Sequence, residues 1–129
     1  MDKIKIDGTV FSGESEGKKF LDLPWVKQQI KEQLGFAPHP GTLNVWLSEE
    51  SMKRKKQLLE KVHPTKICPA HGHCNASIVR AAIGTIECAV VVPEVADYPE
   101  YVLEIIAAVN LRDTFQLEDG SNVTVTFTL

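Results

Sequence analysis

The sequence lacks several features that would assign it to a special class of protein. It has three cysteines among 129 residues, which do not make a disulfide framework and indicate a reducing compartment. No apolar run approaches the length of a membrane span, and the first residues show no apolar segment of the signal-peptide kind. A basic excess is also missing, since the formal net charge is −3, which argues against an electrostatic nucleic-acid binder. We therefore expect a cytoplasmic protein.

What is present is the composition of an ordinary globular protein. Hydrophobic residues make up 43% of the chain and charged residues 24%. A chain of 129 residues fits one domain and can bury a core without disulfides or metals. No internal repeat or low-complexity linker divides it. We therefore expect residues 1–129 to form a single domain.

Hydrophobic periodicity predicts strands joined by short helices. Strands are expected at residues 3–12, 40–47, 76–83, 86–92 and 123–127. Helices are expected at 24–34, at 48–62, at 99–103 and after Asn110, with Ser48 and Asn110 as N-caps. A break at Asp7-Gly8 predicts a bulge or bend in the first strand. Because strands dominate, a small closed barrel is the economical way to remove sheet edges.

Residues 40–47 predict a strand with one polar face. Its aliphatic side chains alternate onto one side, and Thr42 and Asn44 fall together on the other. A hydroxyl and an amide oxygen at this spacing are hard, neutral donors, which suit Mg²⁺ when a phosphorylated ligand supplies the charge. The alternative is an ordinary strand edge with two polar residues facing water.

A polar loop at residues 12–20 is the second candidate site. Gly13 and Gly17 precede Lys18 and Lys19. Backbone N–H groups of such a loop meet phosphate oxygens, while ammonium groups neutralise them. The loop is not a P-loop, because the Gly-Lys-Ser/Thr ending is missing. A flexible polar turn is the alternative interpretation.

Two further clusters invite functional interpretations. Cys68, His71, His73 and Cys74 are ligand types that Zn²⁺ prefers, although one short loop would have to wrap the ion. A polar loop with two free cysteines is the alternative. The cations at residues 53–56 are spread around a predicted helix and balanced by nearby glutamates. We interpret them as a solvated helix face.

A longer pattern connects the candidate sites. It runs through residues 8–13, 16–20, 34–36, 38–44, 91–93, 98–99, 103–107, 110–112 and 117–120. The pieces Pro-Gly-Thr-Leu-Asn at 40–44 and Glu-Ile-Ile-Ala at 104–107 are its most specific parts. In order and spacing this pattern resembles the archaeal CTP-dependent riboflavin kinases. The resemblance covers nearly the whole chain and is weakest over residues 48–73.

The resemblance implies a mainly β fold, a single-domain six-stranded cradle-loop barrel of the RIFT type with short connecting helices. It also implies transfer of the γ-phosphate of CTP to the 5′-hydroxyl of riboflavin, giving FMN and CDP with Mg²⁺. By position, Thr42 and Asn44 match the family's Mg²⁺ ligands. Such chemistry needs a metal on the phosphates, donors for the phosphate oxygens and a positioned hydroxyl.

The resemblance further implies roles for other residues. Nucleotide contacts are expected from Gly13, Glu14, Ser15, Glu16, Gly17, Lys18 and Lys19, and from Val109, Asn110, Leu111 and Arg112. Flavin contacts are expected from Ala96 and Glu104, and Glu104 is the candidate catalytic residue that orients or deprotonates the acceptor hydroxyl. From the residues alone, Glu104 reads as a surface carboxylate, and Arg112 as a partner of Asp113 or Asp119.

Two positions depart from the family pattern. Ser15 replaces the middle glycine of a Gly-x-Gly-x-Gly loop, and Ala96 stands where many relatives have threonine. A lost hydroxyl contact costs about 1 kcal/mol. A second hypothesis is a non-catalytic barrel that binds a flavin, a nucleotide or DNA, although the acidic balance disfavours DNA. We expect small-molecule substrates, no nucleic-acid or membrane partner, and a monomer.

Overall fold

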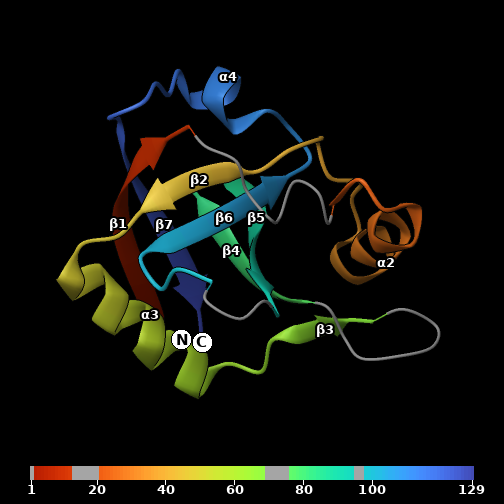
Figure 1. Cartoon of the computed structure of the whole chain (residues 1–129), viewed down its shortest axis with the longest axis horizontal. Coiled ribbons are helices and arrows are strands. Elements are labelled where there is room, and N and C mark those ends of the chain that lie inside the picture. Colours follow the sequence, from red (N-terminus) through yellow and green to blue (C-terminus); the bar gives the residue numbers. More distant parts are fainter. Residues whose placement is uncertain (1, 13–20, 69–75, 95–97) are drawn as a thin grey trace.

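The computed structural model describes residues 2–12, 21–68, 76–94 and 98–129. Its helices and strands, in chain order, are β1 (Lys3–Phe11), α2 (Pro24–Leu34), β2 (Leu43–Trp46), α3 (Glu49–Lys61), β3 (Thr65–Ile67), β4 (Ala76–Ile83), β5 (Ile86–Pro93), β6 (Val102–Ala107), α4 (Leu111–Phe115) and β7 (Asn122–Thr128). Figure 1 shows the strands at the centre, with α4, α2 and α3 placed around them on different sides.

The strands form a closed antiparallel barrel. Their order is β4-β5-β6-β2-β1-β7, and a pairing of Ala82 with Thr126 joins β7 back to β4. The short strand β3 is added at the edge of β4, outside this ring. The expected six-stranded barrel is therefore confirmed, with one additional strand. Among the described residues, no helix is both long and apolar enough to cross a membrane.

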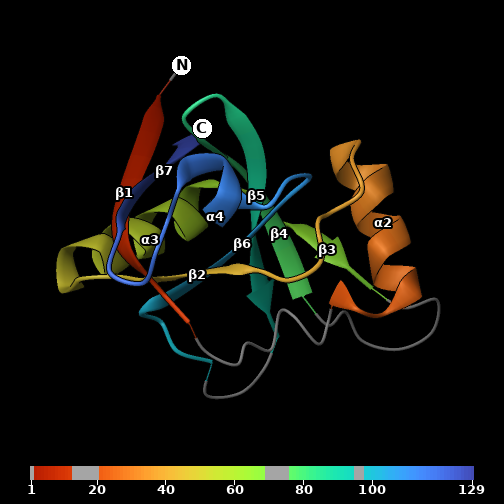
Figure 2. The ribbon, with the colours of Figure 1, turned by 90° about the horizontal axis from the view of Figure 1, so that it is seen from above.

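Two apolar layers stabilise the barrel. The inner layer fills the barrel, and Ile6, Val45 and Phe127 in it are completely buried. The outer layer lies between α2 and the outside of the barrel, where Val26 and Ile30 of the helix pack in one cluster with residues of β4, β5 and β6 such as Ile106. Figure 2 shows α2 standing beside β3 and β4. Part of the outer face is thus closed by a helix.

Local sequence signals explain the helix ends. Pro24 lies in the first turn of α2, and Gly35 ends the helix with a φ of 82°, a conformation that glycine adopts without strain. The Ser48 hydroxyl accepts a hydrogen bond from the Ser51 N–H at 3.2 Å and caps α3. The Asn110 side chain accepts one from the Asp113 N–H at 3.1 Å and caps α4. The predicted helix at 24–34 and the predicted N-caps Ser48 and Asn110 are confirmed.

The expected short helix at residues 99–103 is wrong. The chain turns there and then enters β6, all of whose residues are buried. A strand covered on both faces has no polar alternation, so its sequence does not show the two-residue period. The strand β3 was missed for another reason, because three residues are too few to show a two-residue period.

The expected bulge at Asp7-Gly8 is also not found. Pairing between β1 and β7 is regular from Lys3 through Thr9. Gly8 serves a different purpose, because a Cβ there would lie 2.2 Å from Val45 Cγ1 and 2.7 Å from the Trp46 carbonyl oxygen. The glycine therefore permits β1 to pass close to β2.

Candidate functional site

Three side-chain oxygens come together on the outer face of the barrel. The Thr42 hydroxyl oxygen lies 3.4 Å from Asn44 Oδ1 and 3.4 Å from Glu104 Oε1. Asn44 of β2 pairs directly with Glu104 of β6. Their side chains are only 7% and 1% exposed. We call Thr42, Asn44 and Glu104 the oxygen triad.

Strand geometry explains why the triad faces outward. Neighbouring residues of a strand point to opposite faces. Leu43 and Val45 of β2 and Leu103 and Ile105 of β6 belong to the core inside the barrel. The residues between them, including Glu104, therefore project from the outer surface. The prediction that Thr42 and Asn44 share a face separate from the core is confirmed.

Tyr98 supports the triad and was missed by sequence reasoning. Its hydroxyl donates a hydrogen bond of 2.7 Å to Glu104 Oε2. Burial, and then the bond to the Glu104 carboxylate, raise the pKa of the Tyr98 phenol. The interpretation of Glu104 as a surface carboxylate is wrong, because the residue is buried in the middle of a strand.

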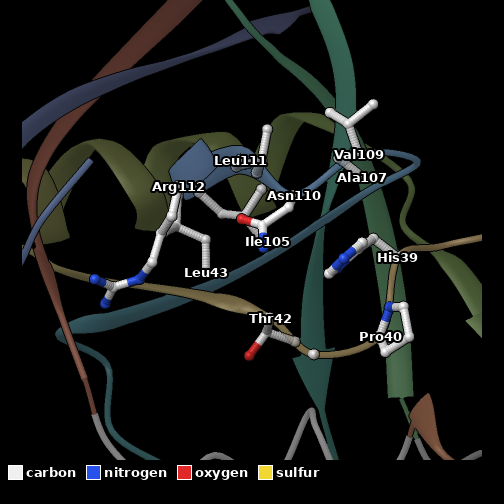
Figure 3. A pocket seen from close by; sticks show the side chains of 11 residues that line it. His39, Pro40, Thr42, Leu43, Ile105, Ala107, Val109, Asn110, Leu111 and Arg112 are labelled. Carbon is white, nitrogen blue, oxygen red and sulfur yellow. The ribbon is translucent and has the colours of Figure 1, made fainter. Parts of the chain in front are cut away.

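A cavity of about 130 Å³ adjoins the triad. Its walls are formed by His39, Pro40, Gly41, Thr42, Leu43, Ile105, Ala107, Val109, Asn110, Leu111 and Arg112. Figure 3 shows the His39 ring and the Asn110 amide beside one space, with Thr42 below them, directly before β2. The structure therefore brings the predicted metal ligand Thr42 to the same cavity as the whole predicted segment 109–112.

Arg112 ties α4 to the end of β1. Its guanidinium lies 2.8 Å from Asp119 Oδ1 and donates to the Phe11 carbonyl at 3.2 Å and to the Ser12 hydroxyl at 3.1 Å. The Arg112 hydrogen bond is the main cause of a lowered pKa for Asp119. The pairing with Asp119 is one of the two partners expected from the sequence. The contacts with Phe11 and Ser12 fix the cation at the end of β1.

Several predicted residues lie outside the described parts of the chain. They are the loop of Gly13, Glu14, Ser15, Glu16, Gly17, Lys18 and Lys19, the flavin candidate Ala96, and His71, His73 and Cys74. Cys68 is described and is disulfide-bonded, so the expectation of a free thiol there is wrong. In the described ranges, no three His, Cys, Asp or Glu residues gather as a metal site. The zinc interpretation has no support.

The chemistry of the triad suits a hard cation. A hydroxyl, an amide oxygen and a carboxylate are oxygen donors, and Mg²⁺ is bound in proteins by few such groups together with phosphate oxygens and water. The buried position lowers the local dielectric constant and strengthens charge interactions. The arrangement can therefore hold a metal–phosphate unit next to the cavity.

Comparison with known proteins identifies the family of this chain. Residues 10–127 match the family model CTP-dep_RFKase, described as "Domain of unknown function DUF120". The chain belongs to the archaeal CTP-dependent riboflavin kinase family. The match includes every residue of the oxygen triad and of the cavity wall.

Individual relatives cover nearly all of the chain. The riboflavin kinase of Methanosarcina barkeri is 39% identical over 97% of this chain and 57% of that protein. The riboflavin kinase of Archaeoglobus fulgidus is 37% identical over 95% of this chain and 54% of that protein. The riboflavin kinase of Ignicoccus hospitalis is 36% identical over 95% and 70%, respectively. This family member thus spans little more than half the length of the first two relatives.

Proposed function

We propose that this chain is a CTP-dependent riboflavin kinase. It would transfer the γ-phosphate of CTP to the 5′-hydroxyl of riboflavin and give FMN and CDP. The observation that carries the proposal is the convergence of the Thr42, Asn44 and Glu104 oxygens beside the cavity that Arg112 lines. Family membership and the names of the relatives support the choice of substrates.

The oxygen triad fits the Mg²⁺ that phosphoryl transfer from a nucleoside triphosphate requires. Thr42 Oγ1 and Asn44 Oδ1 would hold the ion as neutral ligands. When bound, Mg²⁺ would offset the negative charge that develops on the transferring phosphoryl group. The protein residues then have to place two substrates in line.

Glu104 is the group that would act on the acceptor. The riboflavin 5′-oxygen attacks the γ-phosphorus, the bond from that phosphorus to the β,γ-bridging oxygen breaks, and CDP leaves. The hydroxyl proton needs an acceptor within hydrogen-bond reach, and a buried carboxylate beside the metal ligands supplies one. Orienting the hydroxyl is a further contribution of the same carboxylate.

The nucleotide would enter from the α4 side. Residues 109–112 line the cavity, and the Arg112 guanidinium supplies a positive charge at its edge. Arg112 is held by Ser12 and Asp119. The predicted phosphate loop, Gly13 to Lys19, follows Ser12 in the sequence and would supply further contacts with the nucleotide. Flavin contact through Ala96 completes the proposed residue set.

A donor survey tests the proposal. The protein is incubated with riboflavin, Mg²⁺ and each nucleoside triphosphate in turn, and FMN is separated by chromatography. We expect FMN with CTP and its loss when Mg²⁺ is chelated. Absence of FMN with every donor would remove the kinase proposal. Riboflavin binding without FMN would instead favour a non-catalytic flavin-binding barrel.

A further inference from the structure

The two oxygens of the Glu104 carboxylate contact different partners. Glu104 Oε1 faces the Thr42 hydroxyl at 3.4 Å, on the side of the proposed metal ligands. Glu104 Oε2 accepts the Tyr98 hydroxyl hydrogen bond at 2.7 Å. The shorter bond is of the charge-assisted kind, which fixes orientation as well as contributing energy. Tyr98 therefore restrains rotation of the carboxylate plane.

Lys55 of α3 in turn holds the segment that carries Tyr98. Its ammonium donates to the Glu100 carbonyl at 3.3 Å and to the Val102 carbonyl at 3.1 Å. The same ammonium lies 6.0 Å from the centroid of the Tyr98 ring. Burial lowers the pKa of Lys55, against an opposing effect of Glu100. One lysine of the cluster at 53–56 is thus used inside the protein.

A line of contacts therefore runs from α3 to the oxygen triad. Lys55 binds one carbonyl within the turn at residues 99–101 and one directly after it. Tyr98 directly precedes this turn, and Glu104 follows it in β6. The Tyr98 ring also forms part of the wall of a mainly apolar cavity of about 540 Å³ under α3. Lys55 holds the turn through two backbone carbonyls, and Tyr98 holds its start through Glu104.

We propose that Tyr98 is a positioning residue that orients Glu104 toward the acceptor hydroxyl, and that Lys55 fixes the turn that carries Tyr98. This inference rests on the proposed kinase function. The resemblance to the family assigned no role to either residue. A carboxylate that loses the phenol hydrogen bond keeps its place in β6, but it loses the shorter of its contacts with Tyr98 and Thr42, which orient its plane for proton transfer.

The first test compares two tyrosine variants. Tyr98→Phe removes only the hydroxyl, and Tyr101→Phe is the matched control, because Tyr101 is exposed three residues later. We expect Tyr98→Phe to lower kcat about 10-fold, the effect of one lost hydrogen bond to a charged group, with the KM for CTP unchanged. Tyr101→Phe should behave as wild type. Equal kcat values for both variants would overturn the inference.

A double-mutant cycle separates positioning from packing. In a Glu104→Gln background, adding Tyr98→Phe should change the remaining activity less than twofold, because residues that act as a unit are not additive. If Tyr98 acts only through packing, its 10-fold effect would persist in that background and the inference would fail. Lys55→Gln should lower kcat in the same direction as Tyr98→Phe, whereas Lys53→Gln on the exposed side of α3 should not.

A spectrum at neutral pH tests the contact without reference to catalysis. The chain has two tyrosines, so Tyr101→Phe leaves Tyr98 as the remaining phenol. Its near-ultraviolet absorption band should shift in the difference spectrum when Glu104→Gln is added, because the phenol then no longer donates to a carboxylate. Identical spectra would overturn the contact. Wild-type protein that makes no FMN with any donor would refute the proposed function. If the wild type makes FMN and Tyr98→Phe has the same kcat, only the positioning role is refuted.

Discussion

Ile106 and Glu104 lie two residues apart on β6, point to the same outer face, and are each 1% exposed. Ile106 packs in one apolar cluster with Val26 and Ile30 of α2. Glu104 lies among the hydroxyls of Thr42 and Tyr98. The two residues are therefore equally buried, but Ile106 has apolar neighbours and Glu104 has polar ones.

The difference separates what stabilises the barrel from what makes the site. Burying an aliphatic side chain contributes roughly 1.5–3 kcal/mol to folding. Burying a carboxylate costs free energy unless hydrogen bonds compensate, and the two hydroxyls supply them. The α2 side of the outer face is thus a second core. The triad side retains a buried carboxylate, and its hydrogen bonds offset the cost of removing it from water.

The largest effect should come from the triad side. Thr42→Ala with Asn44→Ala should reduce FMN formation by about 10³-fold or more, because both proposed metal ligands are lost. Folding should be nearly unchanged, since neither side chain belongs to the apolar clusters. FMN production and the unfolding midpoint are the two measurements.

The matched control for this double variant is Asn122→Ala with Thr124→Ala. These residues have the same polar types and spacing on β7, and both are exposed. We expect their removal to leave turnover within about twofold of wild type, as for surface changes away from special features. Normal turnover in the triad variant would place the metal site elsewhere.

The α2 side should show the reverse behaviour. Ile106→Ala should lower the free energy of unfolding by about 2–4 kcal/mol, and Ile106→Val by about 1 kcal/mol, because both open space in the cluster with α2. Denaturant unfolding gives the stability, and kcat per folded molecule should stay close to wild type. If Ile106→Ala lowers kcat as much as the triad variant does, the α2 side and the triad side of the outer face are not independent.

The cavity should respond through nucleotide affinity. Arg112→Gln should raise the KM for CTP about 10-fold, the effect of one charge-assisted contact, with a smaller change in the KM for riboflavin. Steady-state kinetics with each substrate varied in turn measures both. Asp119→Asn is the control, because it removes the ion pair and retains the guanidinium. If it weakens CTP binding as much as Arg112→Gln, the ion pair rather than the guanidinium is what matters.

The features that could be predicted from the sequence are those that depend on residues close together in the chain. The ends of α2 and α4 were predictable because Gly35 and Asn110 act within one helical turn. The shared face of Thr42 and Asn44 was predictable because strand alternation is local. Neither argument needs the rest of the chain.

The burial of Glu104 was not predictable in this way. It depends on β2 and β5 lying on both sides of β6 and on the Tyr98 hydroxyl above the carboxylate. Each of these contacts joins separate elements, and the buried run in β6 gave no periodic signal. The inward use of Lys55 was hidden for the same reason, since its neighbours at residues 53–56 have the same charge.

The smallest expected effect is a pH dependence at the Arg112–Asp119 pair. The pKa of Asp119 lies below its ordinary value of 3.8, chiefly because Arg112 donates a hydrogen bond to it. A carboxylate with a lowered pKa stabilises the fold above its ordinary pKa, and this contribution disappears as the pH falls through the lowered value. The Tm of the wild type should therefore exceed that of Asp119→Asn at neutral pH, and this difference in Tm should disappear in strong acid. The pair is exposed, so the shift in Tm should be small. Asp22→Asn, at another exposed position, is the control for the loss of a surface carboxylate. A difference in Tm that stays constant in acid would mean that the ion pair does not contribute to stability. Arg112 would then contribute only to the wall of the cavity.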